Sequence, residues 1–122
     1  MTTPDDYPRA LRSAETAAAA WKQAVEHQQD ATPRHADFYA LAGEMVATLY
    51  ALDDLTVVLA RQVGDYSQGR ALYDDTRTVD PAERLTAAVG SLREVHAALG
   101  VVTPAVHEFW NAIGHVGFEA AP

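Results

Sequence analysis

The chain of 122 residues contains no cysteine. That excludes a disulfide scaffold, a cysteine-ligated zinc or iron–sulfur site and a thiolate nucleophile. Basic residues are also few, because nine Lys and Arg stand against 17 acidic residues and leave a formal net charge of −8. They are scattered singly, whereas a protein that neutralises phosphates needs clustered Lys and Arg. We therefore expect no nucleic-acid partner.

Long uninterrupted apolar runs are lacking as well. The longest near-apolar stretch, Met45 to Ala60, is interrupted by Asp53 and Asp54. It falls short of the roughly 18–20 apolar residues that a membrane span requires. The first ten residues (MTTPDDYPRA) begin with acid and contain no apolar segment of the kind found in secretory signals. The sequence predicts a soluble cytoplasmic protein without a membrane partner, and its excess of Ala and Arg indicates a GC-rich bacterial genome.

What the chain does have is 48% hydrophobic residues, enough to pack one domain spanning residues 1–122. Many of these are alanines, so large apolar side chains are a minority. Apolar residues recur at helical spacing in every long segment, and no segment alternates convincingly at period two. The predicted fold class is all-α, as an antiparallel up-and-down bundle of three long helices.

The three helices have recognisable limits. The first is predicted at about Tyr7–Gln29 and the second at about Ala36–Tyr66. Apolar side chains of the second cover an arc of roughly 200°, counted at about 100° per residue, and more than one neighbour must cover so wide an arc. The third helix is predicted to begin at Pro81, because Asp80 can act as its N-cap and Glu83 follows three positions later.

Two interpretations compete at Gly100–Pro104 near the end of the chain. Gly100 could end the third helix, so that a fourth begins at Thr103. Alternatively, one helix continues with a kink. An unbroken heptad favours the kink, and so does a glycine four residues before the proline, where the ring would clash with a carbonyl. The heptad consists of Leu85, Leu92, Leu99, Val106 and Ile113.

A ridge of small residues runs along the second helix. Small side chains at this spacing allow another backbone to approach closely. We expect the partner of the ridge to be the alanine-rich part of the first helix or another copy of the protein. The ridge consists of Ala36, Ala40, Gly43, Ala47 and Ala51.

One carboxylate interrupts the apolar arc of the second helix. Asp53 stands among apolar neighbours, and a buried carboxylate is costly unless it is paired or hydrogen-bonded. Counting residues through the connections puts His96 and Arg12 at about the same height. The sequence therefore predicts a polar layer of Arg12, Asp53 and His96 inside the bundle. Tyr39 and Tyr50 share the face of Asp53, and one of their hydroxyls could hydrogen-bond to it or line a pocket with it.

A second polar group lies near the C-terminus. Glu108, His115 and Glu119 are spaced by seven and four residues and share one helical stripe. Imidazole and carboxylate groups can hold Zn²⁺, Ni²⁺ or Fe²⁺ when a second helix adds a ligand. The usual Glu-x-x-His and His-x-x-x-His pairs do not occur in the chain, which favours an ordinary solvated face.

Three functions follow, in order of preference. The first is a non-catalytic interaction or accessory protein without a cofactor, which forms a homodimer or binds another protein. The second is small-ligand binding or catalysis at the polar layer, where a His–Asp pair could act as a general base. The third is metal binding by the C-terminal stripe. The chain lacks the G-x-x-x-x-G-K-[ST], G-x-G-x-x-G and G-x-S-x-G motifs, so an enzyme is the less favoured class.

Overall fold

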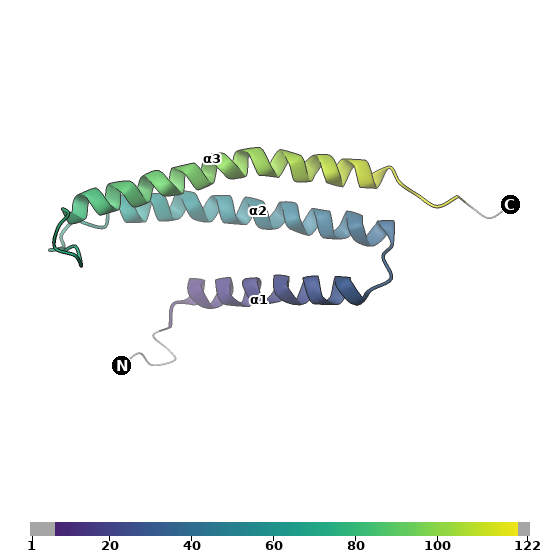
Figure 1. The fold of residues 1–122 in the computed structure, drawn as a ribbon, viewed down its shortest axis with the longest axis horizontal. Helices are drawn as coiled ribbons and strands as arrows, with labels where there is room; N and C mark the ends of the chain where they lie inside the picture. Colours follow the sequence, from purple (N-terminus) through teal and green to yellow (C-terminus); the bar gives the residue numbers. More distant parts are fainter. Residues whose placement is uncertain (1–6, 120–122) are drawn as a thin grey trace. The chain divides into compact units, whose positions relative to one another are not determined.

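The computed structural model describes residues 7–119, and within this range it contains three α-helices and no strand (Figure 1). The helices are α1 (Arg9–Asp30), α2 (His35–Gly64) and α3 (Pro81–Gly114). The predicted all-α class is therefore confirmed. The chain divides into two compact units, one containing α1 and the other containing α2 and α3.

The first unit contains a single helix with few large apolar side chains, namely Leu11, Trp21 and Val25. Pro8 precedes the helix, and its carbonyl accepts the first intrahelical bond from the Arg12 amide at 3.1 Å. A proline suits this end of a helix, where its missing N–H costs nothing. Beyond Asp30 the backbone becomes extended, and Pro33 discourages continuation of the helix.

The second unit is an antiparallel hairpin in which α2 and α3 lie side by side (Figure 1). Their contacts join the beginning of one helix to the end of the other. Trp110, late in α3, covers Gly43, early in α2, and Val89 lies against Gly64 at the opposite end. The segment 65–80 connects the two helices.

The hairpin buries few side chains completely. Its buried apolar residues are Ala42 and Val46, and its helices also bury Thr56 and Thr103. The hydroxyl of Thr56 donates to the carbonyl of Asp53 at 2.7 Å, which makes its burial tolerable. Because most large apolar side chains of α2 and α3 stay partly exposed, contact between these two helices alone does not cover the apolar surface of the unit.

α3 continues through Pro104 without a break, so the interpretation with a fourth helix is wrong. The Oδ1 atom of Asp80 accepts a hydrogen bond from the Ala82 amide at 3.0 Å, which confirms the predicted N-cap. Within the described residues, α3 is also long and apolar enough to count as a candidate membrane span by composition. Arg93 and Glu94 stand near its middle, where charge costs several kcal/mol in a bilayer, so this is weak evidence for a span.

At one position, Gly43, the small-residue ridge of α2 contacts a partner other than the expected ones. Gly43 lies against Trp110 of α3, in the same unit. The expectation that the ridge faces the first helix or another copy is therefore wrong at Gly43. The other members remain exposed: Ala36, Ala40, Ala47 and Ala51.

Two helical glycines allow a test of this packing. A Cβ atom at Gly90 would meet nothing within 4 Å, whereas one at Gly43 would lie 3.2 Å from Cζ2 of Trp110. We expect Gly90→Ala to raise the free energy of unfolding by roughly 0.5–1 kcal/mol, because alanine favours the helix. Gly43→Ala gains the same propensity but presses on the indole ring, so we expect no gain or a loss. Urea denaturation of both variants checks this, and equal stabilisation would contradict the packing of Trp110 on Gly43.

Candidate functional site

The structure brings together two of the three residues of the predicted polar layer. The Nδ1 atom of His96 in α3 lies 2.5 Å from Oδ1 of Asp53 in α2. The hydroxyl of Thr56 lies 3.5 Å from the same carboxylate oxygen. Counting heights along the two helices therefore locates this pair correctly.

The pair does not lie in the interior, as a layer inside the bundle would. The Asp53 side chain is 30% exposed and that of His96 is 58% exposed. Water therefore screens their attraction, and exposed pairs of this kind typically contribute less than about 1 kcal/mol. One ring nitrogen of His96 contacts Asp53, and the exposed remainder of the imidazole is accessible from solvent.

Arg12 belongs to the other unit. Its guanidinium carbon lies 5.6 Å from the centroid of the ring of Tyr7, which precedes α1, and this is a cation–π arrangement. Its carbonyl accepts a hydrogen bond from the Thr16 hydroxyl at 3.0 Å. Membership of Arg12 in the polar layer stays a prediction.

The two predicted tyrosines belong to a row of aromatic rings between the first half of α2 and the last turns of α3. The hydroxyl of Tyr50 lies 3.1 Å from Nε2 of His107, so its partner is an imidazole and not Asp53, which was one of the two possibilities for these tyrosines. Tyr39 packs on Trp110 at a centroid distance of 5.6 Å, and Trp110 lies 5.8 Å from His107. Such tilted pairs stabilise beyond their buried area. Sequence reasoning missed this row, although three-residue spacing puts His107 and Trp110 on one side of α3.

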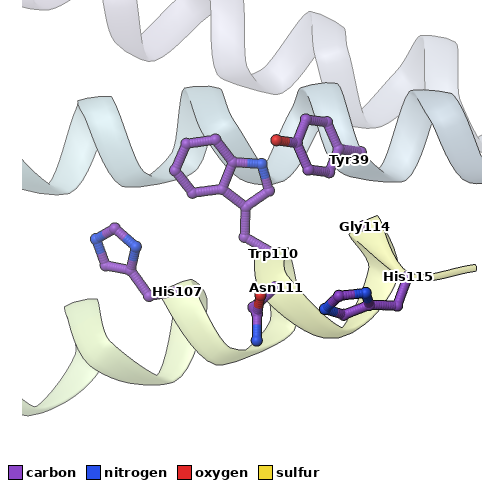
Figure 2. A pocket seen from close by; sticks show the side chains of 6 residues that line it. All are labelled: Tyr39, His107, Trp110, Asn111, Gly114 and His115. Carbon is purple, nitrogen blue, oxygen red and sulfur yellow. The ribbon is translucent and has the colours of Figure 1, made fainter.

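A surface cavity of about 370 Å³ lies beside the aromatic row (Figure 2). Its volume falls at the lower end of the range of small-molecule sites. The indole Nε1 of Trp110 is buried and has no hydrogen-bond partner, which costs roughly 1–3 kcal/mol for such a donor. The cavity is lined by Tyr39, His107, Trp110, Asn111, Gly114 and His115.

The residues of the predicted metal stripe do not form a metal site with other described residues of the second unit. Glu108, His115 and Glu119 are exposed. Within residues 7–119, no three His, Asp or Glu side chains gather closely enough to hold one ion. His115 contributes instead to the wall of the cavity. Metal binding stays a prediction that requires ligands from elsewhere.

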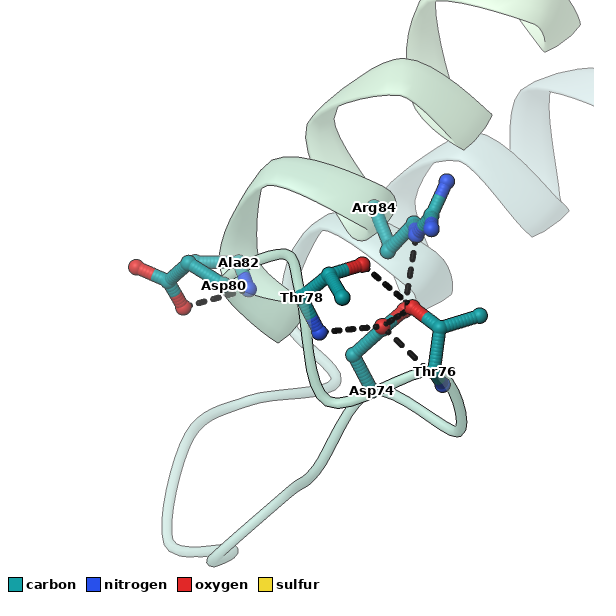
Figure 3. Close-up of polar contacts among 6 residues, drawn as sticks. All are labelled: Asp74, Thr76, Thr78, Asp80, Ala82 and Arg84. Carbon is teal, nitrogen blue, oxygen red and sulfur yellow. Dashed lines mark hydrogen bonds and ion pairs between the residues drawn. The ribbon is translucent and has the colours of Figure 1, made fainter.

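A buried carboxylate in the linker was not anticipated (Figure 3). Asp74 accepts hydrogen bonds from the hydroxyl and the amide of Thr76, from the Thr78 amide, and from Nε of Arg84 at 2.7 Å. The bond from the Thr76 hydroxyl, and then that from Arg84, hold the pKa of Asp74 well below its usual range. Because these bonds tie the linker to the first turns of α3, the role of this cluster is structural.

The residues so far define a cysteine-free α-helical hairpin with an exposed His–Asp pair and a small aromatic cavity. No family model, curated protein or solved structure matches the chain.

Proposed function

We propose that the protein is a non-catalytic helical interaction protein that associates with itself. The observation that supports this proposal is the amount of apolar side chain left exposed on the α2–α3 hairpin. Ala42 and Val46 are its buried apolar residues, whereas many leucine, valine and aromatic side chains of the same helices are more than a third exposed. Monomeric soluble proteins rarely expose large contiguous apolar patches, and such patches mark contacts with other proteins.

The arrangement we propose for the helices is the up-and-down antiparallel bundle. α1 would run antiparallel to α2 after the short connection 31–34, with its alanine-rich seam on the exposed alanines of the ridge. A bend of α3 at Pro104 would allow it to follow its neighbours. The acidic charge and the dispersed arginines support a function without nucleic acid. A cytoplasmic location without a membrane partner completes the proposal.

Native mass spectrometry at low micromolar concentration tests this proposal, because one spectrum reports assembly and bound mass together. The expected result is a homodimer without additional mass. A monomer would contradict self-association. A monomer that carries a reproducible small mass or a metal ion would favour the ligand-binding or metal-binding alternative.

The second candidate function is small-ligand binding at Asp53 and His96. The exposed imidazole, held at one nitrogen by a carboxylate, supports it, because this arrangement fixes the ring for proton transfer or binding. Tyr50, one helical turn before Asp53, and Arg12 remain proposed binding residues of this alternative. Tyr39 does not, because it lies about 21 Å from Asp53 along α2 and lines the cavity beside Trp110 instead.

Two variants separate a functional pair from a structural one. We expect Asp53→Asn and His96→Ala each to lower the free energy of unfolding by less than about 1 kcal/mol, because the pair is exposed. Thermal denaturation measures the loss, and His115→Ala, an exposed histidine outside the pair, is the control. If a ligand is found, both variants should lose it while staying folded. A loss of several kcal/mol without loss of a ligand would mark the pair as a core element.

A further inference from the structure

Exposed apolar side chains of α2 and α3 lie on the same side of the hairpin. Asp53 and His96 face each other, and each is preceded by an apolar residue, Leu52 and Val95. One step along a helix turns the side chain by about 100°. Because the helices are antiparallel and right-handed, one step back along each turns both side chains toward the same side. Leu52 and Val95 therefore share one face.

Spacings of three, four and seven residues extend this face along both helices. Every member is between 37% and 48% exposed. The members, which we call the apolar face, are Met45, Leu52, Leu55 and Leu59 of α2 and Val95, Val102 and Phe109 of α3.

The other side of the hairpin has a different chemistry. One step forward along each helix points to the side opposite the apolar face. Tyr50 and His107, which are hydrogen-bonded to each other, lie toward that side, and so does Asn111 in the wall of the cavity. This side exposes aliphatic residues as well, Val57 and Val101, so it differs from the apolar face in its hydrogen-bonded phenol and imidazole groups.

We infer that the apolar face packs against the same face of a second copy of this chain, an inference that rests on the proposed self-association and specifies its surface. The face is complementary to itself in side-chain size. The α2 part carries long side chains, Leu and Met, whereas the α3 part alternates its larger residues with Ala98, Ala105 and Ala112. A two-fold axis parallel to the helices would place α2 of one copy on α3 of the other, large side chains against small ones.

The area of the face lies at the lower limit for a dimer. Its seven side chains are each 37–48% exposed, and complete burial of the face in two copies would remove on the order of 1,000 Å² from water, about the smallest size of a specific interface. α1 of the same chain fits the face less well. It carries three large apolar residues, Leu11, Trp21 and Val25, and cannot fill the gaps between seven. A second hairpin supplies an equal number.

Analytical ultracentrifugation of two variants tests the inference. Leu55→Glu places a charge on the apolar face, and the matched control Val57→Glu places the same charge on the other side of the same helix. We expect the wild type and Val57→Glu to be dimers. Leu55→Glu should raise the dimer Kd by at least about 100-fold, because a buried unpaired carboxylate is costly. Circular dichroism checks that both variants keep their helices.

The outcomes separate this inference from the proposed function. A monomeric wild type contradicts both. A wild-type dimer that withstands Leu55→Glu contradicts the inference alone and leaves self-association to another surface. Dissociation by Val57→Glu as well as by Leu55→Glu also contradicts the inference, because the contact would then not be confined to the apolar face.

Cross-linking provides a second test that does not depend on a charged variant. The chain has no cysteine, so single cysteines can be introduced without interference. Since Gly43 lies against Trp110 and Gly64 against Val89, Leu55 stands at the height of Ala98 in the hairpin. A mixture of Leu55→Cys chains with Ala98→Cys chains should form cross-linked pairs of one chain of each kind. The proposed pairing of α2 with α3 would be contradicted if Leu55→Cys chains cross-linked with one another. It would also be contradicted if the mixture formed no cross-linked pairs.

Discussion

Replacing Trp110 by alanine should lower the free energy of unfolding by about 2–4 kcal/mol, the largest effect that we expect from a single truncation in the hairpin. Its ring lies 5.6 Å from that of Tyr39 and 5.8 Å from that of His107. It also covers Gly43, which has no side chain of its own to fill the gap. The loss stays below that of a fully buried tryptophan, because the truncation also removes an indole N–H that is buried without a partner.

Urea denaturation at one fixed protein concentration measures this loss, since a dimer would make stability depend on concentration. Val101→Ala is the control, because Val101 lies on the same helix and is 74% exposed. Its effect should stay within about 0.5 kcal/mol. Gly43→Ala in the Trp110→Ala background should become stabilising, as it is expected to be at Gly90. A loss below about 1 kcal/mol for Trp110→Ala would contradict the central place of this ring.

The limits of the helices could be predicted because they depend on local chemistry. Asp80 and Pro81 mark the start of α3 through a cap and a proline without an N–H, and both lie within one turn of the residues that they affect. Continuity through Pro104 follows from an equally local pattern, the heptad on both sides of the proline. The pairing of Asp53 with His96 required only a count of residues along two antiparallel helices of known rise.

The rotation of α2 could not be predicted, because its apolar arc is too wide to show which part meets α3. Met45, Leu52 and Leu59 form the most regular apolar line, yet the structure turns Ala42, Val46 and Thr56 toward the interior of the hairpin instead. Hydrophobic periodicity marks every face that is buried in the final assembly, and it does not distinguish faces buried within one chain from faces buried between chains. The partner of Gly43 was missed for the same reason.

The cluster around Asp74 was missed because part of it is not local. Thr76 and Thr78 follow Asp74 in a pattern typical of turns in which a carboxylate binds nearby backbone amides, and this signal was available in the sequence. Arg84, however, lies ten residues away and reaches Asp74 only after the linker has folded back onto α3. The linker also holds Arg77 at a φ of 59°, a left-handed conformation that the sequence does not announce.

Asp74→Asn should lower the melting temperature at pH 7 by several degrees. The asparagine side chain keeps the size of the carboxyl group but removes the charge that Arg84 and the Thr76 hydroxyl favour. Because folding lowers the pKa of Asp74 below its ordinary value of 3.8, the carboxylate stabilises the folded chain at pH values above 3.8. As the pH falls from 3.8 toward the lower pKa of the folded state, this contribution is progressively lost.

The difference in melting temperature between wild type and Asp74→Asn should therefore be constant from about pH 5 to pH 8 and should shrink below about pH 4. Thermal denaturation followed by circular dichroism across this range measures it. Asp75→Asn, at the exposed neighbouring position, is the control and should leave the melting temperature almost unchanged. A difference that persists undiminished at pH 2.5 would show that the ionised carboxylate of Asp74 does not hold the linker against α3, and that shape alone does.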